Sequence, residues 1–149
     1  MADQIYFEDV EIGSSLPTLK KHPTPRQLVM WAGASGDYYE IHYDKNFAKS
    51  QGLTDVIVHG MLSASFFAQL ITGWIGEWGT LKKLSTSNRQ VIFVNEDVYY
   101  KGIVSKKYNS GNDNYVEIEL WAENNKGEKC ILCNAQVVLP DRDSSRLAG

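Results

Sequence analysis

The spacing of hydrophobic residues changes partway along the chain and divides it into a helical part and a strand-rich part. From Gly60 to about Trp78 the apolar side chains surround a helical wheel, which predicts a long helix buried on most sides. Its first turns carry small residues that let a helix lie close against a sheet, namely Ser63, Ala64, Ser65 and Ala68. After Gly79 four runs rich in β-forming residues predict an antiparallel meander, with strands at 84–94, 98–108, 114–124 and 129–139.

Two shorter helices are predicted before the long one. Thr24 and Pro25 form a helix start, a capping hydroxyl followed by proline at the first helical position, and Gly33 and Gly36 end this helix. Asp44 can cap a second short helix. This order of elements predicts an α+β fold in which a curved antiparallel sheet wraps around the long helix. Because such a sheet has an open face and free edges, we expect the chain to form at least a dimer.

Length and charge narrow the classes of protein to consider. A chain of 149 residues has the length of one domain, and we expect a single domain over 1–140 followed by a polar tail over 141–149. The formal net charge of −3 gives no general attraction to nucleic acid or to an anionic membrane. No apolar run is long enough to span a membrane, and residues 1–4 do not resemble a signal peptide. We therefore expect a cytoplasmic protein that binds neither nucleic acid nor membrane.

Cys130 and Cys133 form a C-x-x-C sequence inside a predicted strand. Alternation along a strand would direct the two sulfur atoms to opposite faces of the sheet, and no second pair of Cys or His lies nearby to complete a zinc site. We expect both residues to act as small buried hydrophobic groups, and we expect no metal site.

Residues capable of proton transfer gather in two segments. In the first, Asp37 and His42 stand five residues apart in a turn flanked by glycine. In the second, His59 and Gly60 directly precede the long helix. A carboxylate and an imidazole can act as general acid and base, and free backbone N–H groups at a helix N-terminus can hold a developing oxyanion. The two segments together therefore supply an acid–base pair and an oxyanion site.

The chain resembles the MaoC-like, or (R)-specific enoyl-CoA hydratase, family of hot-dog proteins in Ser35-Gly36-Asp37-x-x-x-Ile41-His42 and Ile57-Val58-His59-Gly60-Met61-Leu62. The likeness extends from about Pro23 to Pro140. It implies reversible addition of water to a trans-2-enoyl thioester of coenzyme A or an acyl carrier protein, giving a (3R)-3-hydroxyacyl thioester. It assigns catalysis to Asp37 and His42 and oxyanion binding to the Gly60 N–H group, and it implies no cofactor.

The chain departs from the family within the first segment, where Tyr39 and Glu40 replace the usual Asn-Pro. This change leaves the acid–base pair intact and bears on the class of substrate. We expect Tyr38 and Tyr39 to contact the substrate, together with His59 and Met61 of the second segment. The place of His59 before a helix also suits a hydrogen-bonded structural role.

Two interpretations are open for the basic residues Lys82, Lys83 and Arg89. They can bind the phosphates of coenzyme A, or they can form the solvated basic end of a strand. The sequence favours the second interpretation.

Two alternatives to a self-sufficient hydratase follow from the resemblance. A hot-dog thioesterase would cleave the same thioester, but many of these enzymes carry their carboxylate on the central helix, which here offers only Gln69 and, near its end, Glu77. The chain can also be one subunit of a heteromeric dehydratase that pairs with a related inactive hot-dog chain. The presence of Asp37 and His42 would make it the catalytic half.

Overall fold

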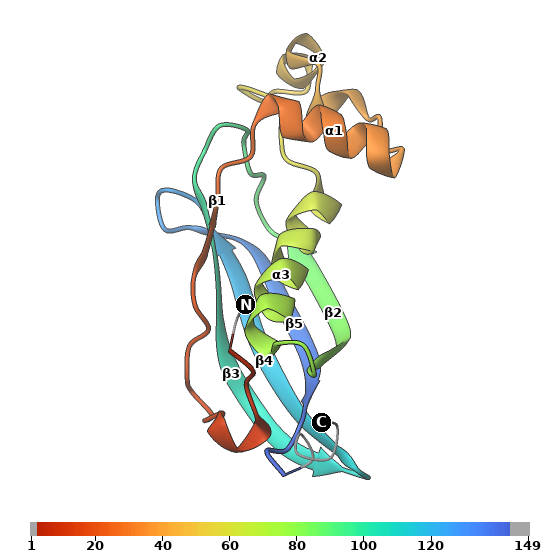
Figure 1. The fold of residues 1–149 in the computed structure, drawn as a ribbon. Coiled ribbons are helices and arrows are strands. Elements are labelled where there is room, and N and C mark those ends of the chain that lie inside the picture. The colour runs from red at the N-terminus through yellow and green to blue at the C-terminus, as the bar shows by residue number, and fades with distance from the viewer. Residues whose placement is uncertain (1–2, 144–149) are drawn as a thin grey trace.

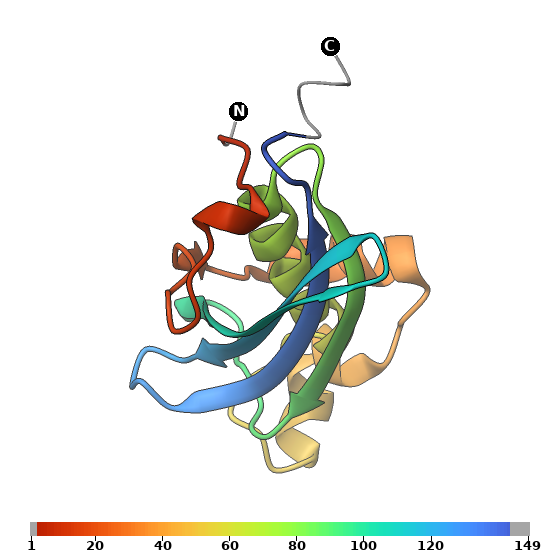
Figure 2. The same ribbon diagram turned by 90° about the horizontal axis from the view of Figure 1, so that it is seen from below.

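The computed structural model describes residues 3–143, and its centre is a five-stranded antiparallel sheet curved around one helix (Figures 1 and 2). The helix is α3 (Gly60–Ile75). The sheet has the order β1-β3-β4-β5-β2, with strands β1 (Leu19–Lys21), β2 (Thr80–Asn88), β3 (Val98–Ser110), β4 (Asp113–Glu123) and β5 (Lys129–Leu139). This is the hot-dog fold, which confirms the predicted class. Most of the predicted tail lies outside the described residues.

Strand β2 lies at one edge of the sheet, next to β5 and far from β3. Only β3, β4 and β5 form the predicted meander, and β2 begins and ends earlier than the predicted strand at 84–94. Its residues are mostly polar and exposed, so they lack the apolar alternation by which a half-buried strand is identified. The apolar residues after it leave the sheet instead, and the Val58 N–H group donates to Ile92 O at 2.8 Å.

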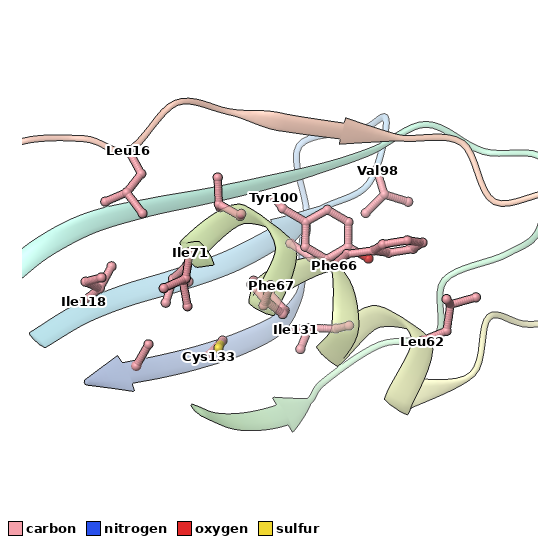
Figure 3. Packing of buried hydrophobic residues seen from close by; sticks show 14 of the residues in the cluster. Leu16, Leu62, Phe66, Phe67, Ile71, Val98, Tyr100, Ile118, Ile131 and Cys133 are labelled. Carbon is pink, nitrogen blue, oxygen red and sulfur yellow. The ribbon is translucent and has the colours of Figure 1, made fainter. Parts of the chain in front are cut away.

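The hydrophobic core lies between α3 and the concave face of the sheet (Figure 3). The ring of Tyr100 on β3 packs edge-on against Phe66 and Phe67 of α3, with centroid separations of 5.5 and 4.9 Å. Helix α3 ends at Ile75, before the predicted end near Trp78, because Gly76 takes a positive φ of 74°. No helix among residues 3–143 is long and apolar enough to cross a membrane.

Both cysteines are buried in this core and both are free thiols. The strand alternation that would place their sulfur atoms on opposite faces is interrupted, because the pairing of β4 with β5 shifts register between Ala122 and Glu123. Cys130 and Cys133 therefore act as small core residues, as expected from the sequence.

Helices α1 (Pro25–Ser35) and α2 (Lys45–Ser50) lie at the end of the molecule where α3 begins (Figure 1). The side chain of Thr24 caps α1 and that of Asp44 caps α2, as predicted. Between them the chain makes a 3-10 turn at Glu40–His42. This arrangement places the segment that contains Asp37 and His42 beside the N-terminus of α3.

His59, the residue before α3, is fully buried. Burial lowers the pKa of His59 below its usual 6.5, and the neighbouring His42 lowers it further. The neutral imidazole is therefore the form that the folded protein favours.

We predict a loss of stability as the pH falls from 7.5 to 5.5. The pKa of His59 is lower in the folded chain than in the unfolded chain, so below about 6.5 the unfolded chain binds more protons and unfolding becomes easier. One such proton changes the free energy of unfolding by at most about 1.4 kcal/mol per pH unit. Urea unfolding at a series of pH values measures the slope of the free energy of unfolding against pH. A His59→Gln variant should lose this slope, and an unchanged slope would contradict the assignment.

Candidate active site

The loop after α1 presents Asp37. Gly36 ends the helix in the left-handed region (φ 78°), and the Asp37 N–H group then donates to Ser35 Oγ at 3.2 Å. The Asp37 carboxylate accepts a bond from the Tyr39 N–H group at 3.4 Å, and its side chain is 46% exposed. The loop thus holds the carboxylate near the surface with Oδ2 uncommitted.

His42 is buried, and the hydrogen bond that its ring makes defines its tautomer. Its Nδ1 lies 2.7 Å from the carbonyl oxygen of Ile57. A carbonyl oxygen can only accept, so Nδ1 carries the proton and Nε2 of the neutral ring has a free lone pair. This Nε2 lies 4.0 Å from Asp37 Oδ2. A basic nitrogen and a carboxylate oxygen therefore face each other across a gap too long for a direct hydrogen bond.

The ring of His59 stacks on that of His42, with centroids 3.8 Å apart and planes inclined by 21°. His59 Nε2 lies 3.4 Å from the main-chain oxygen of Asp37, so this nitrogen carries the proton in a weak hydrogen bond. Its Nδ1 is buried and has no partner in the described part of the chain. Asp37 and His42 are the facing pair of the site. His59 contacts His42 through its ring and Asp37 through the main-chain oxygen.

Asp37, His42 and His59 each place one possible metal ligand within 4.8 Å of the others. The lone pair of an imidazole lies in the plane of its ring, and the two rings here are stacked and nearly parallel. Lone pairs that lie in two nearly parallel planes do not converge on one ion, as a tetrahedral site requires. The arrangement suits proton transfer better than metal binding.

A cavity of about 270 Å³ opens beside His42 and the first turn of α3. The N–H group of Gly60, in the first turn of this helix, has no acceptor within the helix. A Cβ atom at Gly60 would lie 3.0 Å from Asn88 Nδ2, so only glycine fits this approach without displacing the Asn88 side chain. The remaining lining residues are Ile57, Val58, Ser63, Arg89, Gln90, Val91, Ile92 and Ile131.

The structure brings some of the predicted site residues to this cavity and leaves others outside its wall. His42 and Gly60 line it, and Asp37 faces the Nε2 atom of His42. Tyr38 and Met61 are exposed, at 60% and 68%, and neither lines the cavity. Tyr39 is also half exposed and packs edge-on against His42, at a centroid separation of 6.1 Å.

Sequence reasoning missed the contribution of Ser63, Asn88 and Gln90 to the cavity wall. Ser63 could have been found, because it lies one turn after Gly60 on the same side of the helix. No sequence signal connects Asn88 and Gln90 with α3, since they reach it only through the tertiary placement of β2. Of the three basic residues considered above, Arg89 lines the cavity, whereas Lys82 and Lys83 do not.

A sequence model of the family described as MaoC like domain matches residues 9–125. The 3-oxo-4,17-pregnadiene-20-carboxyl-CoA hydratase beta subunit of Mycobacterium tuberculosis is 26% identical over 133 residues, which cover 89% of this chain and 98% of that protein. An (R)-specific enoyl-CoA hydratase of Rhodospirillum rubrum is 33% identical over 66 residues, which cover 44% of this chain and 45% of that protein.

Solved structures agree with this assignment. The (R)-hydratase from A. caviae superposes with a TM-score of 0.80 and 25% sequence identity, over 89% of this chain and 99% of that one. The family match extends over most of the length, and it includes Asp37, His42 and every residue that lines the cavity except Ile131. The chain therefore belongs to the MaoC-like domain family of hydratases and dehydratases.

Proposed function

We propose that this chain catalyses the reversible addition of water to a trans-2-enoyl thioester, giving a (3R)-3-hydroxyacyl thioester. The observation that carries the proposal is that His42 Nε2, the nitrogen with the lone pair in the neutral ring, faces Asp37 Oδ2 at 4.0 Å. A water molecule that donates one hydrogen bond to each of two acceptors, at about 2.8 Å, separates them by roughly 4 to 4.5 Å. The gap has the size that one such water needs.

The proposed reaction begins with this water. Its oxygen attacks the β-carbon of the substrate as one of its protons passes to His42 Nε2 or Asp37 Oδ2. The electron pair of the carbon–carbon double bond moves towards the thioester oxygen and forms an enolate. A proton then returns to the α-carbon on the same face, so that the net change is addition of H₂O. Acid–base positioning of this type contributes about 10²- to 10⁴-fold in rate.

The charge that develops on the thioester oxygen needs a fixed donor. The Gly60 N–H group lies in the wall of the same cavity as His42, at the N-terminus of a sixteen-residue helix. Its position there adds the positive end of the helix dipole to the hydrogen bond. Hydrophobic residues form much of the remaining wall, which suits an acyl chain.

The names of two relatives support the proposal. The Mycobacterium tuberculosis protein is named as a subunit of a CoA hydratase, and the Rhodospirillum rubrum protein, matched over 45% of its length, is named as an (R)-specific enoyl-CoA hydratase. We propose a coenzyme A or acyl carrier protein thioester as substrate on this basis. A thioesterase is the second candidate, but α3 contains no Asp or Glu to act as its carboxylate, and Glu77 lies beyond the end of the helix. This observation favours hydration.

We predict that Asp37→Asn and His42→Gln each lower kcat for hydration of crotonyl-CoA by at least about 10²-fold, because each replaces a group that can take a proton from the attacking water with an amide that cannot. The assay follows loss of the conjugated enoyl absorbance, with chiral analysis of the product and a parallel measurement of released thiol. Asp44→Asn is the matched control, since it changes a nearby carboxylate but keeps an oxygen that can cap α2. Near-normal turnover in both site variants would contradict the proposed roles, and release of thiol would favour the thioesterase.

We also propose that a second hot-dog chain, identical or related, pairs with this one. Strand β2 is nine residues long and, among residues 3–143, pairs with β5 alone, so a row of its backbone groups is open to a second chain. The related Mycobacterium tuberculosis protein is named as a beta subunit, which motivates a heteromer as the alternative to a homodimer.

Light scattering coupled to size exclusion should therefore give the purified chain at least twice the 16.8 kDa mass of one copy. A mass of one copy for the folded chain would exclude the homodimer. Co-expression with a related hot-dog chain would then decide whether a heteromer forms.

A further inference from the structure

The wall of the cavity contains a buried serine hydroxyl, hydrogen-bonded to a tyrosine, that the proposed mechanism does not use. Ser63 lines the cavity and is 1% exposed. Behind it, the fully buried Tyr100 of β3 donates a hydrogen bond from its hydroxyl to Ser63 Oγ at 3.2 Å. Burial raises the pKa of Tyr100 to about 12, so this phenol remains a neutral donor.

The hydroxyl group of Ser63 is still able to donate a hydrogen bond. Its oxygen accepts the bond from Tyr100, and its own hydroxyl proton has no acceptor in the part of the chain that the structure describes. Ser65 on the same helix differs, because its hydroxyl donates to Leu62 O at 2.6 Å. A buried hydroxyl proton without an acceptor costs about 1 to 3 kcal/mol, so this proton is available to an acceptor in the cavity, a water or a ligand.

The direction of the Ser63 side chain follows from helix geometry. Side chains of a helix point towards its N-terminus, so the hydroxyl of Ser63 extends back over the turn that contains Gly60. Both residues line the same cavity. Their two donors, a backbone N–H and a hydroxyl, therefore face one region of it.

We propose that the Ser63 hydroxyl is a second donor to the thioester oxygen of the substrate, beside the Gly60 N–H group. Tyr100 is then a positioning residue, because its hydrogen bond occupies one lone pair of Ser63 and directs the serine proton into the cavity. Hydrogen bonds in such a chain strengthen one another, so the phenol also makes Ser63 a better donor. The proposal rests on the proposed hydration of a thioester.

The first test is kinetic. Ser63→Ala should lower kcat on crotonyl-CoA by on the order of 10², the cost of losing one oxyanion donor, with a much smaller change in KM. Tyr100→Phe should lower kcat less, and should add little to the loss in the Ser63→Ala background. Ser65→Ala is the matched control and should stay within twofold of the wild type. A Ser63→Ala variant that also stays within twofold would overturn the proposal.

The second test measures the hydrogen bond itself. Crotonyl-CoA labelled with ¹³C at the thioester carbonyl is bound to the Asp37→Asn variant, and its carbonyl stretching frequency is recorded by infrared difference spectroscopy. Adding Ser63→Ala should move this frequency towards its value in water-free solvent, because one donor is lost, whereas adding Ser65→Ala should not. An unchanged frequency would contradict the proposal even if Ser63→Ala affected turnover through stability.

The two hypotheses fail in different ways. If the wild type hydrates crotonyl-CoA and Ser63→Ala alters neither kcat nor the carbonyl frequency, only the role of Ser63 is wrong. If the wild type neither hydrates nor binds crotonyl-CoA, the proposed function fails and the role of Ser63 fails with it. Should Ser63→Ala not fold, Tyr100→Phe provides the same spectroscopic readout with the serine in place.

Discussion

The hydrogen bond between His42 Nδ1 and the carbonyl oxygen of Ile57 joins the loop after α1 to the segment that leads into α3. The N–H group of Ile57 donates a hydrogen bond to Ile41 O at 3.2 Å, so each segment donates one hydrogen bond to the other. The first bond fixes the tautomer of His42 and directs Nε2 towards Asp37. The role proposed for His42 depends on that orientation, because a proton on Nε2 of the neutral ring would leave it no lone pair to face the water.

The site is rigid on one side and open on the other. His59 lies against the face of His42, fully buried, and leaves its own Nδ1 without a partner. A buried polar atom of this kind costs free energy that the surrounding core must supply, and such atoms are common at functional sites. Asp37, in contrast, stands on an exposed loop. The arrangement combines a base held by the core with a carboxylate that a substrate or a partner chain can reach.

Local signals predicted much of this molecule, and tertiary contacts account for the rest. The caps at Thr24 and Asp44, the central helix and the curved antiparallel sheet follow from short-range chemistry and hydrophobic spacing. The place of β2 does not, because its exposed polar residues carry no periodic signal. The same strand brings Asn88 to Gly60, so the composition of the cavity wall could not be deduced from the sequence. The stacking of His42 on His59 likewise depends on how the two segments pack.

The protonation of His42 in solution is the most direct test of this account. Two-dimensional ¹⁵N–¹H NMR of the imidazole nitrogens, with His42→Gln used for assignment, distinguishes which ring nitrogen carries the proton. When the ring is neutral, we expect His42 to carry its proton on Nδ1 and to leave Nε2 unprotonated. A neutral ring with its proton on Nε2 would contradict the account, because that tautomer could neither donate to Ile57 nor accept a proton from a water held beside Asp37.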